Sequence, residues 1–458
     1  MNFHNDYLTD ASDAYYQMKP SLGITIPPRD EFAHPTCHNY STKMQQVIGY
    51  YPPGILILYL LLSSCVPAPI TSPILTPTSS TMTRTTEGQT PIRHTVTAPA
   101  YTPSPAIPSH VQLLDFELLG VPASYKPIKS HWSLWDLQLW HDRIYLAHSD
   151  WSSNTGPMQM IYYDLNTGEV VHDEDFIVDE EALELFRVYD DTLYAPGSDA
   201  TESWEFGNIY FKRWGEPWVK MRSIPLGGHV WDLAVLDGAL VAVGTAAREP
   251  PDSYGAVWIS RDDGQSWEWG PDLRAEGYTE ATSLFVLGDK LYVTTVATGC
   301  LVFDGISWTE IDCLASDIFK GTYHVHKNAR FENVIAMAPN WCVSDTHLHF
   351  FDGEEHWFVD FDELVHDVVS TDDGLYVLCG EPSGEGSIFF APSLVCHCEQ
   401  DFTRIVNLDM RNGESSAGLY EVNVCPMGNT PHCLEYANGR FYVGLADGRL
   451  FRSEPYQP

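Results

Sequence analysis

One pattern recurs seven times in the last three-quarters of the sequence. Each copy reads as a short apolar strand, a tight turn with Asp, Asn or Gly, and a second apolar strand carrying an anchor residue, usually aromatic. The anchors, 41 to 66 residues apart, are Tyr145, Tyr194, Val241, Tyr292, Ile335, Tyr376 and Tyr442. A period of roughly 40–50 residues with strand-only content is typical of a β-propeller. We therefore expect an all-β, seven-bladed β-propeller, with six or eight blades as the alternative counts.

The end of the chain predicts how the ring of blades closes. The last repeat turns at Asn438-Gly439 and holds three strands, one fewer than a four-stranded blade requires. Far upstream, residues 113–118 alternate apolar and acidic side chains, as a half-buried strand does. We expect 113–118 to supply the missing strand beside 449–453.

Residues 1–65 indicate an export signal. An apolar run from Gly54 to Leu62 is too short for a membrane-spanning helix, which needs about 20 residues, but fits the core of a signal peptide. Leu62-Ser63-Ser64-Cys65 resembles a bacterial lipobox, which implies lipidation of Cys65. The run lies far from Met1, so we suspect a mis-set start, with Met44 as the candidate, although that start leaves no positive charge. The alternative is a plain signal peptide or short anchor with an incidental Cys65.

Residues 66–110 are rich in Pro, Thr and Ser. Such a segment cannot bury enough apolar surface to offset its chain entropy, so we expect a disordered tether. The order of signal (1–65), linker (66–110) and globular domain (111–458) predicts an exported protein of the cell envelope, either lipid-anchored or secreted.

The charge balance excludes some partners. The formal net charge is −37, with only 25 Lys and Arg residues. Nucleic-acid binding needs a basic face, so we expect no nucleic-acid partner. Membrane association is expected only through the lipid or signal anchor, because no polybasic patch is present. The acidic surface is interpreted as a source of solubility, with cation binding as the alternative, and we expect a monomer.

One hairpin carries a recognisable motif. Residues 260–267 resemble the Asp-box, Ser-x-Asp-x-Gly-x-Thr/Ser-Trp, at every fixed position. These positions are Ser260, Asp262, Gly264, Ser266 and Trp267. Asp-box propellers include sialidases, sortilin-like receptors, xyloglucan hydrolases and photosystem assembly factors. In them the motif is peripheral and structural, so the resemblance implies a fold and no activity.

The catalytic residues of sialidases are not recognisable in this sequence. Those enzymes carry an early Phe/Tyr-Arg-Ile-Pro motif, and the nearest match, Met221 to Pro225, has an extra Ser and lies in the second repeat. We therefore assign no catalytic residue and lean against an enzyme. No nucleotide-binding or zinc-protease motif indicates a cofactor.

Eight of the ten cysteines lie in the propeller region, which after an export signal suggests disulfides. Cys300 and Cys313 flank a hairpin, and Cys425 and Cys433 flank a short loop. Buried free thiols are the alternative. The run 396–398, Cys-His-Cys, lacks a second ligand pair, so we expect no metal site.

A candidate ligand site lies around the central channel. The residue nine positions before each anchor is expected on the innermost strand, and these residues are Asp136, Leu185, Asp232, Ser283, His326, Asp367 and Cys433. We take Asp136, Asp232, His326, Asp367 and the adjacent His432 as candidate ligand-binding residues. Carboxylates and imidazoles converging in a funnel also suit acid–base chemistry. The competing interpretation is structural, because inner Asp residues of a propeller often bond to neighbouring blades.

The sequence favours a scaffold that binds a glycan or protein ligand over a face built by insertions such as 198–206 and 245–255. A glycoside hydrolase or lyase using funnel carboxylates is the first alternative. An assembly factor for a membrane complex, similar to the photosystem group, is the second.

Overall fold

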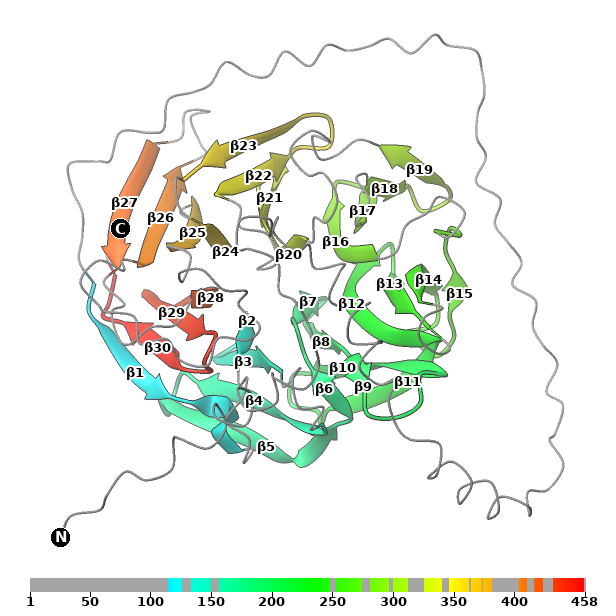
Figure 1. Cartoon of the computed structure of the whole chain (residues 1–458), viewed down its shortest axis with the longest axis horizontal. Coiled ribbons are helices and arrows are strands. Elements are labelled where there is room, and N and C mark those ends of the chain that lie inside the picture. The colour runs from blue at the N-terminus through cyan, green and yellow to red at the C-terminus, as the bar shows by residue number, and fades with distance from the viewer. Residues whose placement is uncertain are drawn as a thin grey trace, which may run out of the picture. The chain divides into compact units, whose positions relative to one another are not determined.

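The computed structural model describes residues 114–125, 133–149, 156–247, 253–273, 281–295, 300–311, 325–339, 346–361, 364–372, 374–380, 403–409, 416–422 and 431–456. All of them belong to one compact unit, within Thr71–Pro458. Their strands form seven antiparallel sheets that are arranged radially around a centre (Figure 1). The predicted all-β propeller is confirmed, and each sheet corresponds to one copy of the sequence repeat.

The first three sheets are numbered here as blades 1 to 3. Blade 1 contains β2 (Leu134–Trp140), β3 (Arg143–His148), β4 (Met158–Asp164) and β5 (Glu169–Val178). Blade 2 contains β7 (Arg187–Tyr189), β8 (Thr192–Pro196), β10 (Phe206–Arg213) and β11 (Val219–Pro225). Blade 3 contains β12 (Gly227–Leu236), β13 (Ala239–Ala246), β14 (Tyr254–Ser260) and β15 (Glu268–Trp269), and is extended by β9 (Ser198–Ala200) and β6 (Glu180–Ala182).

The remaining sheets follow in chain order. Blade 4 contains β16 (Ala281–Leu287), β17 (Lys290–Thr295), β18 (Cys300–Phe303) and β19 (Trp308–Ile311). Blade 5 contains β20 (Val325–Phe331), β21 (Val334–Pro339), β22 (His347–Phe351) and β23 (His356–Asp360). Blade 6 contains β24 (Leu364–Thr371), β25 (Gly374–Gly380), β26 (Thr403–Asp409) and β27 (Ser416–Val422). Blade 7 contains β28 (Pro431–Ala437), β29 (Arg440–Leu445), β30 (Leu450–Ser453) and β1 (Phe116–Gly120), which precedes a short 3₁₀ helix, η3 (Pro122–Tyr125).

The predicted closure of the ring is confirmed. β1 pairs antiparallel with β30, with Phe116 opposite Ser453 and Leu118 opposite Phe451. An ion pair of 2.6 Å between Arg452 Nη2 and Glu117 Oε2 joins the same two strands. Blade 7 is therefore built from both ends of the propeller sequence, and the outermost strand comes from the N-terminal side.

The hairpins form where the sequence supplies residues that tolerate positive φ. Asp237 and Gly238 have φ of 48° and 75°, and Asn438 and Gly439 have φ of 51° and 72°. Two successive left-handed residues define the type of two-residue turn whose twist matches the flanking strands. These turns fix the pairing register of β12 with β13 and of β28 with β29.

The core lies between facing blades. Between blades 1 and 2, for example, Tyr145 and Met160 pack with Leu193 and Tyr210, all fully buried. Large rigid side chains fill the wedge between two radial sheets, which explains why the repeat anchors are so often aromatic. Trp140 and Trp218 belong to the same cluster.

The hairpin of residues 260–267 is held by hydrogen bonds of its own side chains. Asp262 accepts hydrogen bonds from Ser266 N–H (2.8 Å) and Ser266 Oγ (2.6 Å), which lower its pKa, and from Ser260 Oγ (2.8 Å). Gly264 has φ of 81°. The Trp267 indole donates to Gly264 O (3.1 Å) and to Ser223 Oγ of blade 2 (3.0 Å). The hairpin is thus tied both to itself and to the preceding blade.

The cysteine predictions have different outcomes. Cys300 is disulfide-bonded, but Cys313 lies outside the described residues, so their pairing stays a prediction. The predicted bridge from Cys425 to Cys433 is wrong. Cys433 is a buried free thiol that lies 3.5 Å from the carbonyl oxygen of Leu134, because its strand turns this position toward blade 1 and away from its own loop.

The N-terminal predictions fall on residues that the structure does not describe. The signal region, Cys65 and the linker all precede residue 114, as does the suspected start at Met44. Among the described residues, no helix is both long enough and apolar enough to span a membrane.

Candidate functional site

Six of the seven innermost strands carry the same irregularity. In each, the pairing register shifts by one residue just before a side chain next to the centre, at 134/136, 230/232, 281/283, 325/327, 365/367 and 431/433. An extra residue in one strand is a β-bulge, which re-aims the side chains around it. The residues after the bulges are Asp136, Asp232, Ser283, Lys327, Asp367 and Cys433.

The count of nine residues from the anchor finds five of these six positions. In blade 5 it selects His326, which lies on the innermost strand β20 as expected but one residue before Lys327, the equivalent of Asp136. Lys327 lies opposite Ala338 as Asp136 lies opposite Ala147, so the true anchor is Ala336 and not Ile335. His326 lies at the bulge of β20, and its side chain is outside the described part of the structure.

In blade 2 the count fails for a different reason. The innermost strand β7 is only three residues long, and the predicted Leu185 precedes it. Arg187, opposite Tyr194, is the residue of this strand that bonds to the aspartate of the next blade.

Three aspartates of the innermost strands clasp the next blade. In each case one carboxylate oxygen accepts a backbone N–H: Asp136 from Phe186 (2.7 Å), Asp232 from Leu284 (2.8 Å) and Asp367 from Leu434 (2.7 Å). All three carboxylates are buried. A buried carboxylate that accepts backbone hydrogen bonds is a strong tie, because an unpaired N–H at this site would carry its full desolvation cost.

Glu435 makes the same connection across the point where the ring closes. Its Oε2 accepts the N–H of Leu139 in blade 1 at 2.7 Å, and its Oε1 accepts the N–H of Tyr436 at 2.8 Å. Burial raises the pKa of Glu435 to about 7. Blade 7 is thus held to blade 1 by a carboxyl group as well as by β1.

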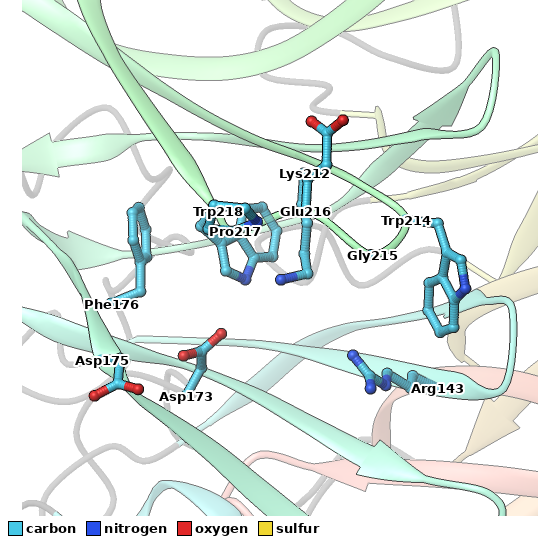
Figure 2. A pocket seen from close by; sticks show the side chains of 10 residues that line it. All are labelled: Arg143, Asp173, Asp175, Phe176, Lys212, Trp214, Gly215, Glu216, Pro217 and Trp218. Carbon is cyan, nitrogen blue, oxygen red and sulfur yellow. The ribbon is translucent and has the colours of Figure 1, made fainter.

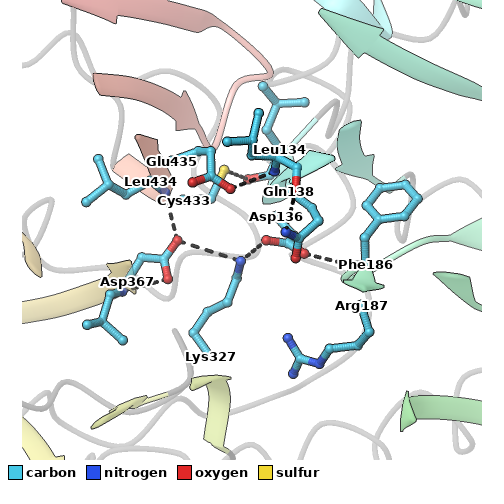
Figure 3. A network of polar contacts seen from close by, with 12 residues as sticks. Leu134, Asp136, Gln138, Phe186, Arg187, Lys327, Asp367, Cys433, Leu434 and Glu435 are labelled. Atoms are coloured by element: carbon cyan, nitrogen blue, oxygen red, sulfur yellow. Dashed lines mark hydrogen bonds and ion pairs between the residues drawn. The ribbon is translucent and has the colours of Figure 1, made fainter. Parts of the chain in front are cut away.

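Two cations balance the carboxylates. Lys327 of blade 5 forms an ion pair with Asp136 of blade 1, and its Nζ lies 3.7 Å from Asp367 of blade 6 (Figure 3). Arg187 of blade 2 binds Asp232 of blade 3 through two hydrogen bonds, of 2.9 Å and 3.0 Å. We call Asp136, Arg187, Asp232, Lys327, Asp367 and Glu435 the channel network.

The channel network has its bonding capacity committed to the protein. Burial raises the pKa of Asp367, although Lys327 and the N–H groups of Leu434 and Val368 act in the opposite direction. Buried ions persist only where they are paired and hydrogen-bonded, as Asp136, Asp232 and Asp367 are; Glu435 accepts two backbone N–H groups without a cation. These contacts are those of a clasp between blades.

The remaining candidate, His432, also has a packing position. Its ring stacks on Trp135 at a centroid distance of 5.0 Å, and both side chains are buried. His432 and Trp135 are the bulge residues of blades 7 and 1, so the stack lies across the blade interface. A similar stack joins His229 and Trp231 in blade 3 at 4.9 Å.

A pocket of about 530 Å³ lies between blades 1 and 2 (Figure 2), and none of the residues that line it belongs to the channel network. Its walls come from β3, the outer strand β5, and the end of β10 with the turn that leads into β11; we call it the blade 1–2 pocket. It is lined by Arg143, Asp173, Asp175, Phe176, Lys212, Trp214, Gly215, Glu216, Pro217 and Trp218. The 214–218 turn follows β10, whereas the insertion 198–206 precedes it, so the pocket and the predicted insertion face lie at opposite ends of this strand.

The pocket contains the same types of charged residue as the channel network, but most of them differ in how they are bonded. The side chains of Asp173, Asp175, Lys212 and Glu216 make no hydrogen bond or ion pair with any other described residue. Burial lowers the pKa of Lys212. In Figure 2 the ammonium of Lys212 and the carboxylate of Asp173 both point into the space between the two blades.

Aromatic rings stand at both ends of the pocket (Figure 2). Trp214 is 40 % exposed, yet His141 (4.1 Å between ring centroids), Trp140 (5.2 Å) and the Arg143 guanidinium (4.9 Å) hold its ring in place. At the other end, Phe176 stacks on the buried Trp218. Sequence reasoning missed the pocket, because its residues come from two repeats and follow no period.

Trp214 is the one pocket-lining residue among the exposed large hydrophobic residues in the described part of the chain.

Comparison with known proteins identifies the architecture. No family model matches the chain, and no curated protein matches its sequence. The structure is similar to the WD40 domain of Pan2 from Neurospora crassa (TM-score 0.50, 10% identity, covering 76% of this chain and 98% of that one). It is similarly close to virginiamycin B lyase from Staphylococcus aureus (TM-score 0.50, 8% identity, covering 74% and 99%). The fold is that of a β-propeller. At these identities the likeness shows the fold alone.

Proposed function

We propose that this chain is an exported, surface-tethered scaffold that binds a glycan or protein ligand in the blade 1–2 pocket. The observation that supports the proposal most is the contrast in bonding. The charged groups around the centre are engaged by the protein, whereas four charged side chains of the pocket form no hydrogen bond or ion pair with a described residue: Asp173, Asp175, Lys212 and Glu216. The order of signal, linker and domain in the sequence supports export.

The glycoside hydrolase alternative has weaker support. Such enzymes need one carboxyl group to protonate the leaving group and a second to act as base or nucleophile. Asp136, Asp232 and Asp367 instead accept backbone N–H groups of the neighbouring blade. No contact of the described residues favours an assembly factor for a membrane complex, so that interpretation rests on the Asp-box resemblance.

The test measures turnover and binding on the same protein. Purified full-length protein is assayed on chromogenic glycosides, sialosides included, and is then applied to immobilised glycan and peptide arrays. We expect no turnover, and binding that Trp214→Ala abolishes. Phe358→Ala is the matched control, because Phe358 is a similarly exposed aromatic residue on β23 of blade 5. Turnover that Asp232→Asn abolishes without unfolding would establish a hydrolase and overturn the proposal.

Export is tested separately. A bacterium that expresses the full-length protein is grown with a labelled fatty acid, and a second culture expresses the Cys65→Ala variant for comparison. We expect label in the parent chain and none in the variant. Equal label in both chains, or none in either, would contradict lipidation at Cys65.

A further inference from the structure

The proposed function leaves the chemical class of the ligand open, and the blade 1–2 pocket narrows it. Resting on that function, we infer that the pocket binds an uncharged carbohydrate, a short oligosaccharide without carboxylate, phosphate or amine groups. The inference combines three observations: charges of both signs in the pocket, a rigid exposed indole, and a strongly negative molecule.

The charges in the pocket are mixed. Asp173 and Asp175 come from β5, while Lys212 comes from β10 on the opposite wall. Arg143 adds a second cation and Glu216 a third carboxylate. An anionic ligand meets three carboxylates there, and a cationic ligand meets two cations, so a ligand of either sign faces repulsion inside the same small space.

An uncharged polyol avoids that conflict. A sugar hydroxyl donates a hydrogen bond to a carboxylate and accepts one from an ammonium or guanidinium group, and such charge-assisted bonds are stronger than neutral ones. Asp173 and Lys212 point toward the same space from opposite walls (Figure 2). Lys212 lies over the Trp218 ring at 5.8 Å, but neither side chain forms a hydrogen bond or ion pair with a described residue. Their hydrogen-bonding capacity is therefore available to hydroxyl groups.

The aromatic rings suit the C–H faces of a sugar. Trp214 presents a ring that is 40 % exposed and is already held by His141, Trp140 and Arg143. A ring fixed before binding loses little side-chain entropy when the ligand stacks on it. The volume of about 530 Å³ is within the range of about 300–1,000 Å³ that small-ligand pockets occupy, which leaves room for a short oligosaccharide.

The net charge of the whole molecule disfavours one competing class of ligand, the polyanions. The formal net charge of −37 repels polyanions such as acidic polysaccharides at long range. An uncharged glycan does not feel this field, so its affinity should vary little with ionic strength. A charged ligand would show a steep salt dependence, which gives the inference a readout independent of mutations.

The experiment uses full-length protein and four probe sets: neutral oligosaccharides, uronic-acid oligosaccharides, amino-sugar oligosaccharides and a peptide array. Hits are measured by titration calorimetry at low and high salt. We expect neutral oligosaccharides to bind, with affinity changing less than about twofold with salt. We expect Trp214→Ala to weaken them at least tenfold, Asp173→Asn and Lys212→Met each to weaken them severalfold, and Phe358→Ala to have no effect.

The other outcomes separate this inference from the proposed function. Tighter binding of charged oligosaccharides would overturn the inference. Peptides that bind in a Trp214-dependent manner while no glycan binds would also overturn it, yet would leave the binding function standing. No Trp214-dependent binding of any probe, by variants with a parent-like melting profile, would overturn both.

Discussion

The channel network and the blade 1–2 pocket contain the same chemical groups in opposite states. In the channel network, Lys327 reaches two buried aspartates and Asp232 is held by Arg187. In the pocket, Lys212 and Asp173 are partly exposed and form no hydrogen bond or ion pair with a described residue, although Lys212 Nζ lies 5.8 Å from the centre of the Trp218 ring. Residue type and convergence alone therefore do not separate a structural clasp from a ligand site. What separates them is whether the hydrogen-bonding capacity is already used.

The largest expected difference in stability between the two regions follows from replacing the lysine of each, Lys327 in the channel network and Lys212 in the pocket. Lys327→Met leaves Asp136 and Asp367 buried without their cation, so the free energy of unfolding should fall by about 3–5 kcal/mol. Lys212→Met, in the pocket, should change it by no more than about 0.5 kcal/mol. Chemical denaturation of both variants measures this, and equal losses would remove the distinction between the two regions.

Replacing one aspartate in each region, Asp232 and Asp173, should give a smaller difference in stability. Asp232→Asn keeps an acceptor for Leu284 N–H but removes the charge opposite Arg187, which should cost about 1.5–3 kcal/mol. Asp173→Asn should be within about 0.5 kcal/mol of the parent. A parent-like denaturation midpoint for Asp232→Asn would show that Arg187 finds another partner and that the clasp is weaker than its geometry indicates.

A pH profile tests the buried acids. Glu180 accepts hydrogen bonds from Asn208 Nδ2 (2.5 Å) and Tyr210 Oη (3.1 Å), and burial raises its pKa to about 8. Between the unfolded pKa of about 4.5 and that value, the folded state binds the proton and the unfolded state does not. Stability therefore falls as pH rises through this window, by at most about 1.4 kcal/mol per pH unit for this group.

Glu180→Gln should flatten that fall, because glutamine does not titrate. Glu216→Gln, in the pocket, is the matched control and should leave the slope unchanged, since Glu216 is exposed and has no described side-chain partner. Thermal unfolding from pH 5 to pH 9 measures both slopes. Parallel profiles for the parent and Glu180→Gln would contradict the raised pKa.

The smallest effect is expected at His141, whose ring packs on Trp214 and whose Nε2 lies 2.7 Å from Asp191 Oδ1. His141→Ala should loosen the indole and weaken ligand binding about two- to fivefold, while stability changes by no more than about 0.5 kcal/mol. Titration calorimetry measures the affinity of this variant for the ligand that binds the parent most tightly in a Trp214-dependent manner. An unchanged affinity would mean that the ring is held sufficiently by Trp140 and Arg143.

Much of the fold was predictable because its determinants are local and repeated. Asp237-Gly238 and Asn438-Gly439 turn in the way that their residue types indicate, and alternation in 113–118 locates the closing strand. The count from the anchors finds Asp136, Asp232 and Asp367 beside the centre. In blade 5, where Ile335 is one residue out of register, it gives the neighbour of Lys327, and in blade 2, where β7 is too short, it fails.

The candidate site was less predictable, because partners are chosen across blades. No spacing in the sequence shows that Lys327 pairs with Asp136, almost two hundred residues earlier. The blade 1–2 pocket joins an outer strand to the turn of the next blade, and neither belongs to the repeated inner-strand pattern. The available signal of the pocket in the sequence was a tryptophan, Trp214, beside the turn residue Gly215.

The position of β1 has a mechanical consequence. The residues that link the propeller to everything upstream enter it through the outermost strand of blade 7, which is held to β30 by one hydrogen-bonded ladder. A pull on the N-terminal side of the chain is therefore carried first by that ladder and by the Glu117–Arg452 pair. Under load the ring would open at this seam before any other blade is disturbed, so the strand that completes the fold also sets the force that the fold withstands.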